Sequence, residues 1–150
     1  MKRFRFTLQS LLNIKVALEK QQKAELAEVE ARLRVLVAEL TRILDRHASL
    51  REEYKSLSGE LTSADFQFYL TGFQALRDRE RLQRVRVTAC EKEKAEVQAR
   101  LIETMTERKT VEKLKEKKYA EYLEECRKED DLIINEYVSN KVAVGGDSDG

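Results

Sequence analysis

An unbroken stripe of apolar residues, spaced alternately by three and four, is the feature that most constrains this chain. The stripe spans five heptads and has one polar member; its residues are Leu26, Val29, Leu33, Leu36, Leu40, Ile43, His47, Leu50, Tyr54, Leu57 and Leu61. A mean spacing of 3.5 residues keeps the stripe on one helix face and imposes a left-handed supercoil. Because the flanking positions are mostly Glu, Arg, Lys and Ala, the stripe is narrow. A narrow stripe indicates a coiled-coil partner rather than a globular core.

The chain has one good helix break, between Ser56 and Asp65. Gly59 can serve as the C′ residue of the first helix, since glycine tolerates the left-handed conformation found there. Thr62 or Ser63 can cap the next helix, and Asp65 would lie in its first turn, where a carboxylate suits the helix dipole.

These signals set the expected organisation. We predict a coiled-coil hairpin over residues 1–140, with helix one at about 7–57, a turn at about 58–62 and helix two at about 63–139. The absence of proline supports helices of this length. Residues 141–150 are rich in Gly and Asp, and we expect them to form a disordered tail.

Helix two has a less regular stripe. Its start is clean, but between residues 77 and 96 several apolar residues offer competing phases, and the stripe resumes at Val97. Two long helices and one short turn predict an all-α, antiparallel two-stranded coiled-coil hairpin. The alternative is a parallel dimer of one continuous helix. The break at Gly59 and the change of phase across it favour the hairpin.

Composition excludes several functions. With 29 Lys+Arg against 28 Asp+Glu, no global field recruits nucleic acid or a membrane surface. One histidine leaves no His-rich metal site and a single candidate base for a nucleophilic triad, so we expect no enzyme and no cofactor.

No apolar run is long enough for a membrane span, and polar residues interrupt the N-terminal apolar stretch, so we expect no export signal. Cys90 and Cys126 form no CxxC motif, which favours free thiols in the cytosol.

Four features are candidate sites. His47 is best interpreted as a polar seam residue that fixes register. Five arginines within residues 77–86 form either a solvated helix face or a basic docking or anion-binding patch. The mixed-charge run over residues 107–118 fits an exposed helix. The apolar N-terminal tip, with Phe4 and Phe6, either docks on a partner or packs on the C-terminal helix of its own chain.

Two motifs resemble one known family. The opening pattern consists of Phe4, Phe6, Leu8, Gln9, Leu11, Leu12 and Lys15. It is similar to the N-terminal signature of the FliJ family, the stalk proteins of the flagellar type III export ATPase. The run from Glu107 to Lys117, followed by Tyr122 and the acidic residues 129–131, is similar to the C-terminal half of that family.

The resemblance implies a non-enzymatic antiparallel hairpin similar to the rotor shaft of rotary ATP synthases. It implies that the paired helix ends enter a hexameric export ATPase, that the turn end faces the membrane export gate, and that export chaperones also bind. The implied location is cytoplasmic, peripheral at the inner face of the cell membrane at the flagellar base, without a membrane span. Carried over by position, the ATPase contacts are Phe4, Phe6, Leu8, Leu11 and Leu12. The gate contacts are Phe66, Tyr69, Phe73 and Leu76, and Gly72 departs from the family pattern among them.

Three other functions stay open at this point. The first is the equivalent stalk of a virulence secretion system. The second is a generic dimeric coiled-coil scaffold. The third is a nucleic-acid-binding helix that uses the arginine cluster, although the near-zero net charge and the lack of interleaved aromatic residues disfavour nucleic acid.

Overall fold

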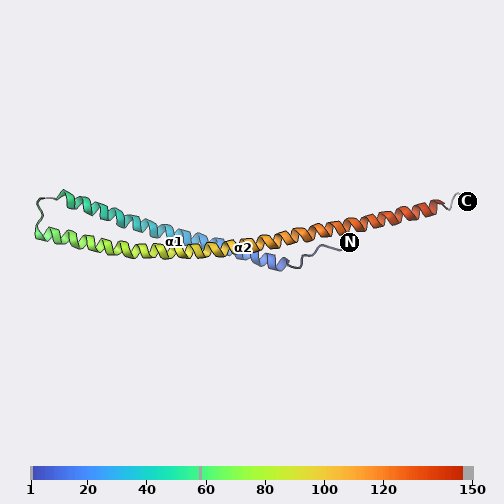
Figure 1. The fold of residues 1–150 in the computed structure, drawn as a ribbon, viewed down its shortest axis with the longest axis horizontal. Coiled ribbons are helices and arrows are strands. Elements are labelled where there is room, and N and C mark those ends of the chain that lie inside the picture. Colours follow the sequence, from blue (N-terminus) through green and yellow to red (C-terminus); the bar gives the residue numbers. More distant parts are fainter. Residues whose placement is uncertain (1, 58, 147–150) are drawn as a thin grey trace. The chain divides into compact units, whose positions relative to one another are not determined.

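The computed structural model of the chain describes residues 2–57 and 59–146, and their regular structure is entirely helical. Helix α1 spans Gln9–Ser56 and helix α2 spans Ser63–Gly146 (Figure 1). The all-helical fold is therefore confirmed. The chain divides into two compact units: one is Glu19–Glu103, and the other joins Met1–Leu18 to Thr104–Gly150.

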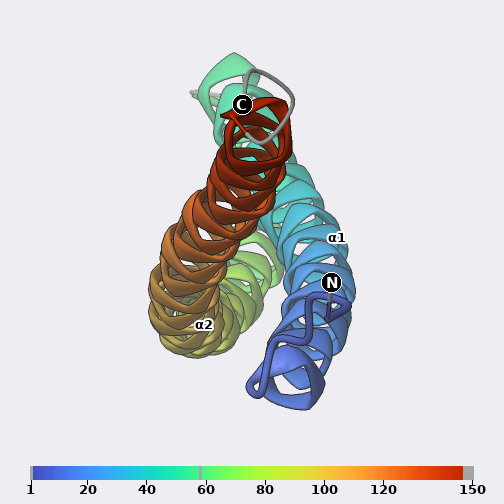
Figure 2. The same cartoon turned by 90° about the vertical axis from the view of Figure 1, so that its right-hand side faces the viewer.

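The unit Glu19–Glu103 is an antiparallel pair of helices. As residue numbers rise along α1 they fall along α2, so that Glu25 meets Arg100, Arg32 meets Glu93, and Leu50 lies over Gly72. Within this unit α1 and α2 run side by side (Figures 1 and 2). Two helices of one chain packed in this way are consistent with the predicted hairpin rather than with one continuous helix.

The apolar stripe predicted on α1 is the face that packs on α2. Every member of the stripe from Leu26 to Tyr54 is buried or half-buried, while Leu57, beyond the end of α1, is 39% exposed. Val29 and Leu50 are the most enclosed members, at 2% and 6% exposure. The 3.5-residue period therefore identified the contact face of this helix correctly.

The seam of α2 is more regular than its apolar residues suggested. From Tyr69 to Thr104, buried or half-buried residues recur in alternating steps of three and four, with half-buried Gly72 and Glu93 beside them; the residues of this seam are Tyr69, Phe73, Leu76, Glu80, Gln83, Val87, Cys90, Lys94, Val97, Leu101 and Thr104. Leu82 and Val85, which suggested a competing phase, are 53% and 61% exposed. The apolar stripe over residues 77–96 is interrupted, as predicted, because polar Glu80, Gln83 and Lys94 occupy seam positions, but the packing face keeps a single phase through them.

Gln83 is the most buried polar residue of the seam, at 3% exposure. Its amide nitrogen donates to the backbone carbonyl of Leu36 at 2.9 Å and to Oε2 of Glu39 at 3.2 Å. A buried amide costs little when its hydrogen bonds are made, and much when the register slips and breaks them. Gln83 therefore fixes the register of the hairpin, the role that the sequence suggested for His47.

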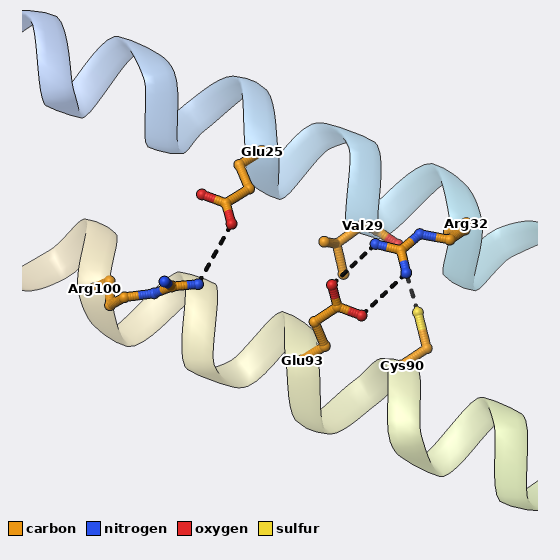
Figure 3. A network of polar contacts seen from close by, with 6 residues as sticks. All are labelled: Glu25, Val29, Arg32, Cys90, Glu93 and Arg100. Carbon is orange, nitrogen blue, oxygen red and sulfur yellow. Dashed lines mark hydrogen bonds and ion pairs between the residues drawn. The ribbon is translucent and has the colours of Figure 1, made fainter.

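Two apolar clusters hold the helices together. One contains Val29, Cys90 and Val97; the other contains Leu50, Tyr69 and Leu76. The Cys90 thiol also lies 3.8 Å from the carbonyl oxygen of Val29, to which it donates a weak hydrogen bond. Ion pairs flank the first cluster: Arg32 forms two hydrogen bonds with Glu93, and Arg100 lies 3.4 Å from Glu25 (Figure 3).

The Arg32–Glu93 ion pair leads to a testable prediction about the pKa of Glu93. The hydrogen bonds from Arg32 hold the pKa of Glu93 below its ordinary value. A lowered carboxyl pKa contributes stability that is present above the unfolded-state pKa and is lost as pH falls through the folded-state pKa. In an NMR titration of side-chain carboxyl carbons, we expect Glu93 to titrate below the exposed glutamates, and Arg32→Gln to restore the ordinary value. Arg34→Gln is the control and should leave Glu93 unchanged; equal midpoints in wild type and Arg32→Gln would contradict the pairing.

The link between the helices depends on one glycine. The amide of Glu60 donates to the carbonyl of Leu57 at 3.2 Å, and Gly59 between them has φ +115°. Gly59 therefore lies within a turn after the helix end, not at the C′ position that we expected. At the start of α2, Thr62 Oγ1 accepts from the amide of Asp65 while the Asp65 carboxylate accepts from the amide of Thr62. This reciprocal cap confirms Thr62 as the capping residue.

Gly59→Ala is expected to lower the free energy of unfolding by about 1–2 kcal/mol, because the left-handed conformation is unfavourable for residues with a Cβ atom. No atom lies within 4 Å of the Cβ that alanine would add, so the cost arises from the backbone alone. Urea denaturation followed by circular dichroism measures it. Gly145→Ala is the control, since that glycine is helical and also has open space around it. A Gly59→Ala variant as stable as wild type would rule out the strained turn.

Helix α2 extends further than predicted. We expected it to end near Ser139 and to be followed by a disordered tail over residues 141–150, but residues 141–146 belong to α2. Val142, Ala143 and Val144 contain no helix breaker, and the chain reaches its paired glycines only at Gly145. Residues 147–150 of the predicted tail lie outside the described residues.

Candidate functional site

The N-terminal segment packs on α2 within the unit formed by Met1–Leu18 and Thr104–Gly150. The Phe4 ring lies 5.1 Å from that of Tyr119 and 5.4 Å from that of Tyr122, and the Tyr122 hydroxyl donates to the carbonyl oxygen of Lys2 at 2.7 Å. Lys15 also forms an ion pair with Glu107. Interaction with the Cys126 side chain, together with desolvation, raises the pKa of Tyr122. Of the two uses that the sequence suggested for the aromatic tip, packing on its own chain is the one observed for Phe4.

The five residues predicted to contact an ATPase are unequally available. Phe4 and Phe6 are half-buried, and Leu12 is only 7% exposed. Leu8, immediately before α1, and Leu11, in its first turn, are 37% and 38% exposed and lie three residues apart. Leu8 and Leu11 therefore form the apolar surface that a partner can reach without displacing the N-terminal segment.

The end of α2 is uncovered by any of the residues that the structure describes. Every residue from Arg127 to Gly146 is exposed, including a group of large apolar side chains: Leu132, Ile133, Ile134, Tyr137, Val138, Val142 and Val144. A solvent-exposed helix gains nothing from apolar residues at this density unless a partner covers them. We did not predict this surface: residues 132–138 were assigned to helix two without a role, and only Val142 and Val144 fall in the tail expected to be disordered.

The four residues predicted to contact an export gate also differ in exposure. Tyr69 and Leu76 are buried at 9% and 7% exposure and pack against Leu50 of α1. Phe73 is half-buried and its ring contacts those of His47 and Tyr54. Phe66 is 51% exposed, in the first turn of α2. The structure thus places three of the four in the seam and leaves Phe66 accessible.

Two accessible residues near the turn were missed. Phe68 is 68% exposed, and Leu70, one turn after Phe66, is 39% exposed. Their signal was present in the sequence, because both fall outside the three-and-four stripe on which Tyr69 and Phe73 lie. Gly72 lies opposite α1, where an added Cβ would be 3.1 Å from a methyl group of Leu50. Gly72, where the resemblance suggested a departure from the family pattern, therefore lies at a close approach of the two helices.

The remaining candidates show no sign of metal or membrane chemistry. His47 is half-buried in the seam beside Phe73, with ring centroids 5.4 Å apart. No group of three or more potential metal ligands occurs among residues 2–57 and 59–146. In the same described ranges, no helix has an apolar stretch of the length needed to cross a membrane. Cys90 and Cys126 are both free thiols.

Comparison with known proteins supplies the family. The sequence model of the family described as Flagellar FliJ protein matches residues 4–145, which is nearly the whole chain. The comparisons with curated proteins and with solved structures gave no match. The matched range includes exposed Leu8 and Leu11, the exposed apolar residues between Leu132 and Val144, and the aromatic start of α2. The chain belongs to the FliJ family, and its role lies in flagellar protein export.

Proposed function

We propose that this protein is the non-enzymatic stalk of the flagellar type III export apparatus and that it acts by contact with a hexameric export ATPase. The family match over residues 4–145 is the observation that carries this proposal. A stalk needs length and stiffness; α1 and α2 have 48 and 84 residues and pack antiparallel within the unit Glu19–Glu103. The proposal includes a shaft-like role similar to that in rotary ATP synthases, at the inner face of the cell membrane at the flagellar base.

The ATPase contact is proposed for the unit that contains both chain ends. Leu8 and Leu11 offer exposed apolar side chains, and the uncovered end of α2 offers a second apolar surface in the same unit. Phe4, Phe6 and Leu12, the other members of the predicted set, are buried or half-buried in the same unit, where Phe4 packs on Tyr119 and Tyr122. Unequal contacts of one hairpin with six subunits would favour some subunit conformations over others and so promote assembly and cycling.

The membrane export gate is proposed to contact the turn end of α2. Phe66 is the exposed member of the predicted set, and Leu70, one turn later, is also exposed; Tyr69, Phe73 and Leu76 lie in the seam of the same helix. Export chaperones are further proposed partners, because they are implied for the family as a whole.

ATP hydrolysis by the cognate export ATPase, measured with and without the full chain, tests the proposal. We expect stimulation by wild type and its loss in Leu8→Ala/Leu11→Ala. The matched control is Val35→Ala/Val37→Ala, which removes two exposed apolar side chains from α1 in the other unit, at 58% and 43% exposure. Absence of stimulation by wild type, under conditions in which the ATPase forms hexamers, would refute the stalk function. Equal stimulation by both double variants would refute the contact site alone.

A further inference from the structure

A groove lined by arginines lies between α1 and α2 within the unit Glu19–Glu103. Its volume is about 460 Å³, and four guanidinium groups line it: Arg42 and Arg46 from α1, and Arg79 and Arg86 from α2. The two α1 arginines are one helical turn apart and the two α2 arginines are two turns apart, so each pair shares one face of its helix. The groove therefore presents positive charge from both sides along its length.

These four arginines have no acidic partner among the residues that the structure describes. Neighbouring arginines do: Arg84 pairs with Glu80 at 2.9 Å, and Arg32 pairs with Glu93 at 3.0 Å. Glu39 is the single carboxylate of the lining, and it already accepts a hydrogen bond from Gln83. In a chain with almost equal numbers of acidic and basic residues, four unpaired guanidinium groups around one groove form a local anion-binding surface.

The rest of the lining determines which anion fits. Ile43, Leu76 and Leu82 add apolar surface between the arginines, and no aromatic side chain lines the groove. Leu82 is 53% exposed, so this surface is open to a ligand. Single-stranded nucleic acid depends on aromatic stacking, which is missing here. A single phosphate ion is too small to contact both Arg79 and Arg86, because the two residues are separated by roughly 10 Å along the helix.

We propose that this groove binds an acidic protein segment that also carries apolar side chains. Carboxylates would pair with the arginines on both walls, in the bidentate geometry that guanidinium groups favour. Apolar side chains of the same segment would cover Leu82 and the accessible part of Ile43. This assignment rests on the groove alone and does not depend on the ATPase or gate contacts proposed above.

Fluorescence anisotropy with a labelled peptide of repeated Glu-Glu-Leu units, added to the full chain, tests the proposal. We expect Arg79→Gln/Arg86→Gln to weaken binding by about tenfold or more, which corresponds to the loss of two charge-assisted contacts. The matched control is Arg77→Gln/Arg81→Gln, which removes the same charge from the same helix but outside the groove. Its affinity should stay within about twofold of wild type. Circular dichroism checks that both variants remain helical.

Further probes separate the possible occupants. A Gln-Gln-Leu peptide should not bind, and a Glu-Glu-Ser peptide should bind more weakly than Glu-Glu-Leu; equal binding of the serine peptide would overturn the apolar part of the proposal. Equal losses of affinity in the two double variants, or no binding of Glu-Glu-Leu to wild type at physiological salt, would overturn the site.

Competition by a single-stranded oligonucleotide that depends on Arg79 and Arg86 would assign the groove to nucleic acid instead. Self-association abolished by Arg79→Gln/Arg86→Gln in sedimentation would assign it to a second copy.

Discussion

Val97→Asp is expected to disrupt the centre of the hairpin, lowering the melting temperature by about 10 °C or more. Val97 is 1% exposed and packs in the cluster with Val29 and Cys90. An aspartate there must be buried without a partner or force the helices apart, at a cost of about 4 kcal/mol. Lys94 and Arg100 lie one turn away, but they already pair with Glu30 and Glu25 on α1. Thermal unfolding followed by circular dichroism measures the loss.

Val85→Asp is the matched control, because it introduces the same side chain on the same helix at a position that is 61% exposed. Its cost should stay within about 0.5 kcal/mol, as for surface substitutions in general. Equal melting of the two variants would mean that Val97 does not face α1. That result would contradict the seam assignment on which the antiparallel pairing depends.

The sequence predicted the helices and the packed face of α1 because both depend on local regularities. The stripe that contains Leu26, Val29 and Leu33 could be recognised because all its members except His47 are apolar. The same reasoning failed on α2, where Gln83 occupies the seam and only its partners on α1 make its burial favourable. A hydrogen bond between residues far apart in the sequence leaves no mark in the periodicity of one helix. The exposed apolar residues Leu82 and Val85 added a misleading second phase.

The sequence indicated which segments carry the candidate surfaces, but not which residues of each segment are exposed. The family motif located the N-terminal tip, yet it could not show that Leu12 is enclosed while Leu8 and Leu11 are open. The arginine cluster was visible in the sequence, but Arg42 and Arg46 come from the other helix. Which arginines share a groove depends on the register of the pair, and the sequence of one helix does not set that register.

Tyr69→Ala/Leu76→Ala is expected to separate the helices near the turn and to abolish gate binding indirectly. Both residues belong to the cluster around Leu50, and truncation of buried side chains of this size costs roughly 2–5 kcal/mol each. Amide hydrogen exchange should therefore show lost protection in α1 around Leu50. Phe66→Ala, at a 51% exposed position, should weaken binding to the gate in a pull-down while protection stays at the wild-type level.

The two variants together distinguish a contact from its support. Loss of gate binding in both, with lost protection only in Tyr69→Ala/Leu76→Ala, would establish Phe66 as part of the contact and the seam residues as its scaffold. Gate binding that survives Phe66→Ala would remove the accessible member of the predicted set, because the other members face α1. Protection that survives Tyr69→Ala/Leu76→Ala would contradict the packing itself, since two buried side chains cannot be removed from a narrow interface without cost.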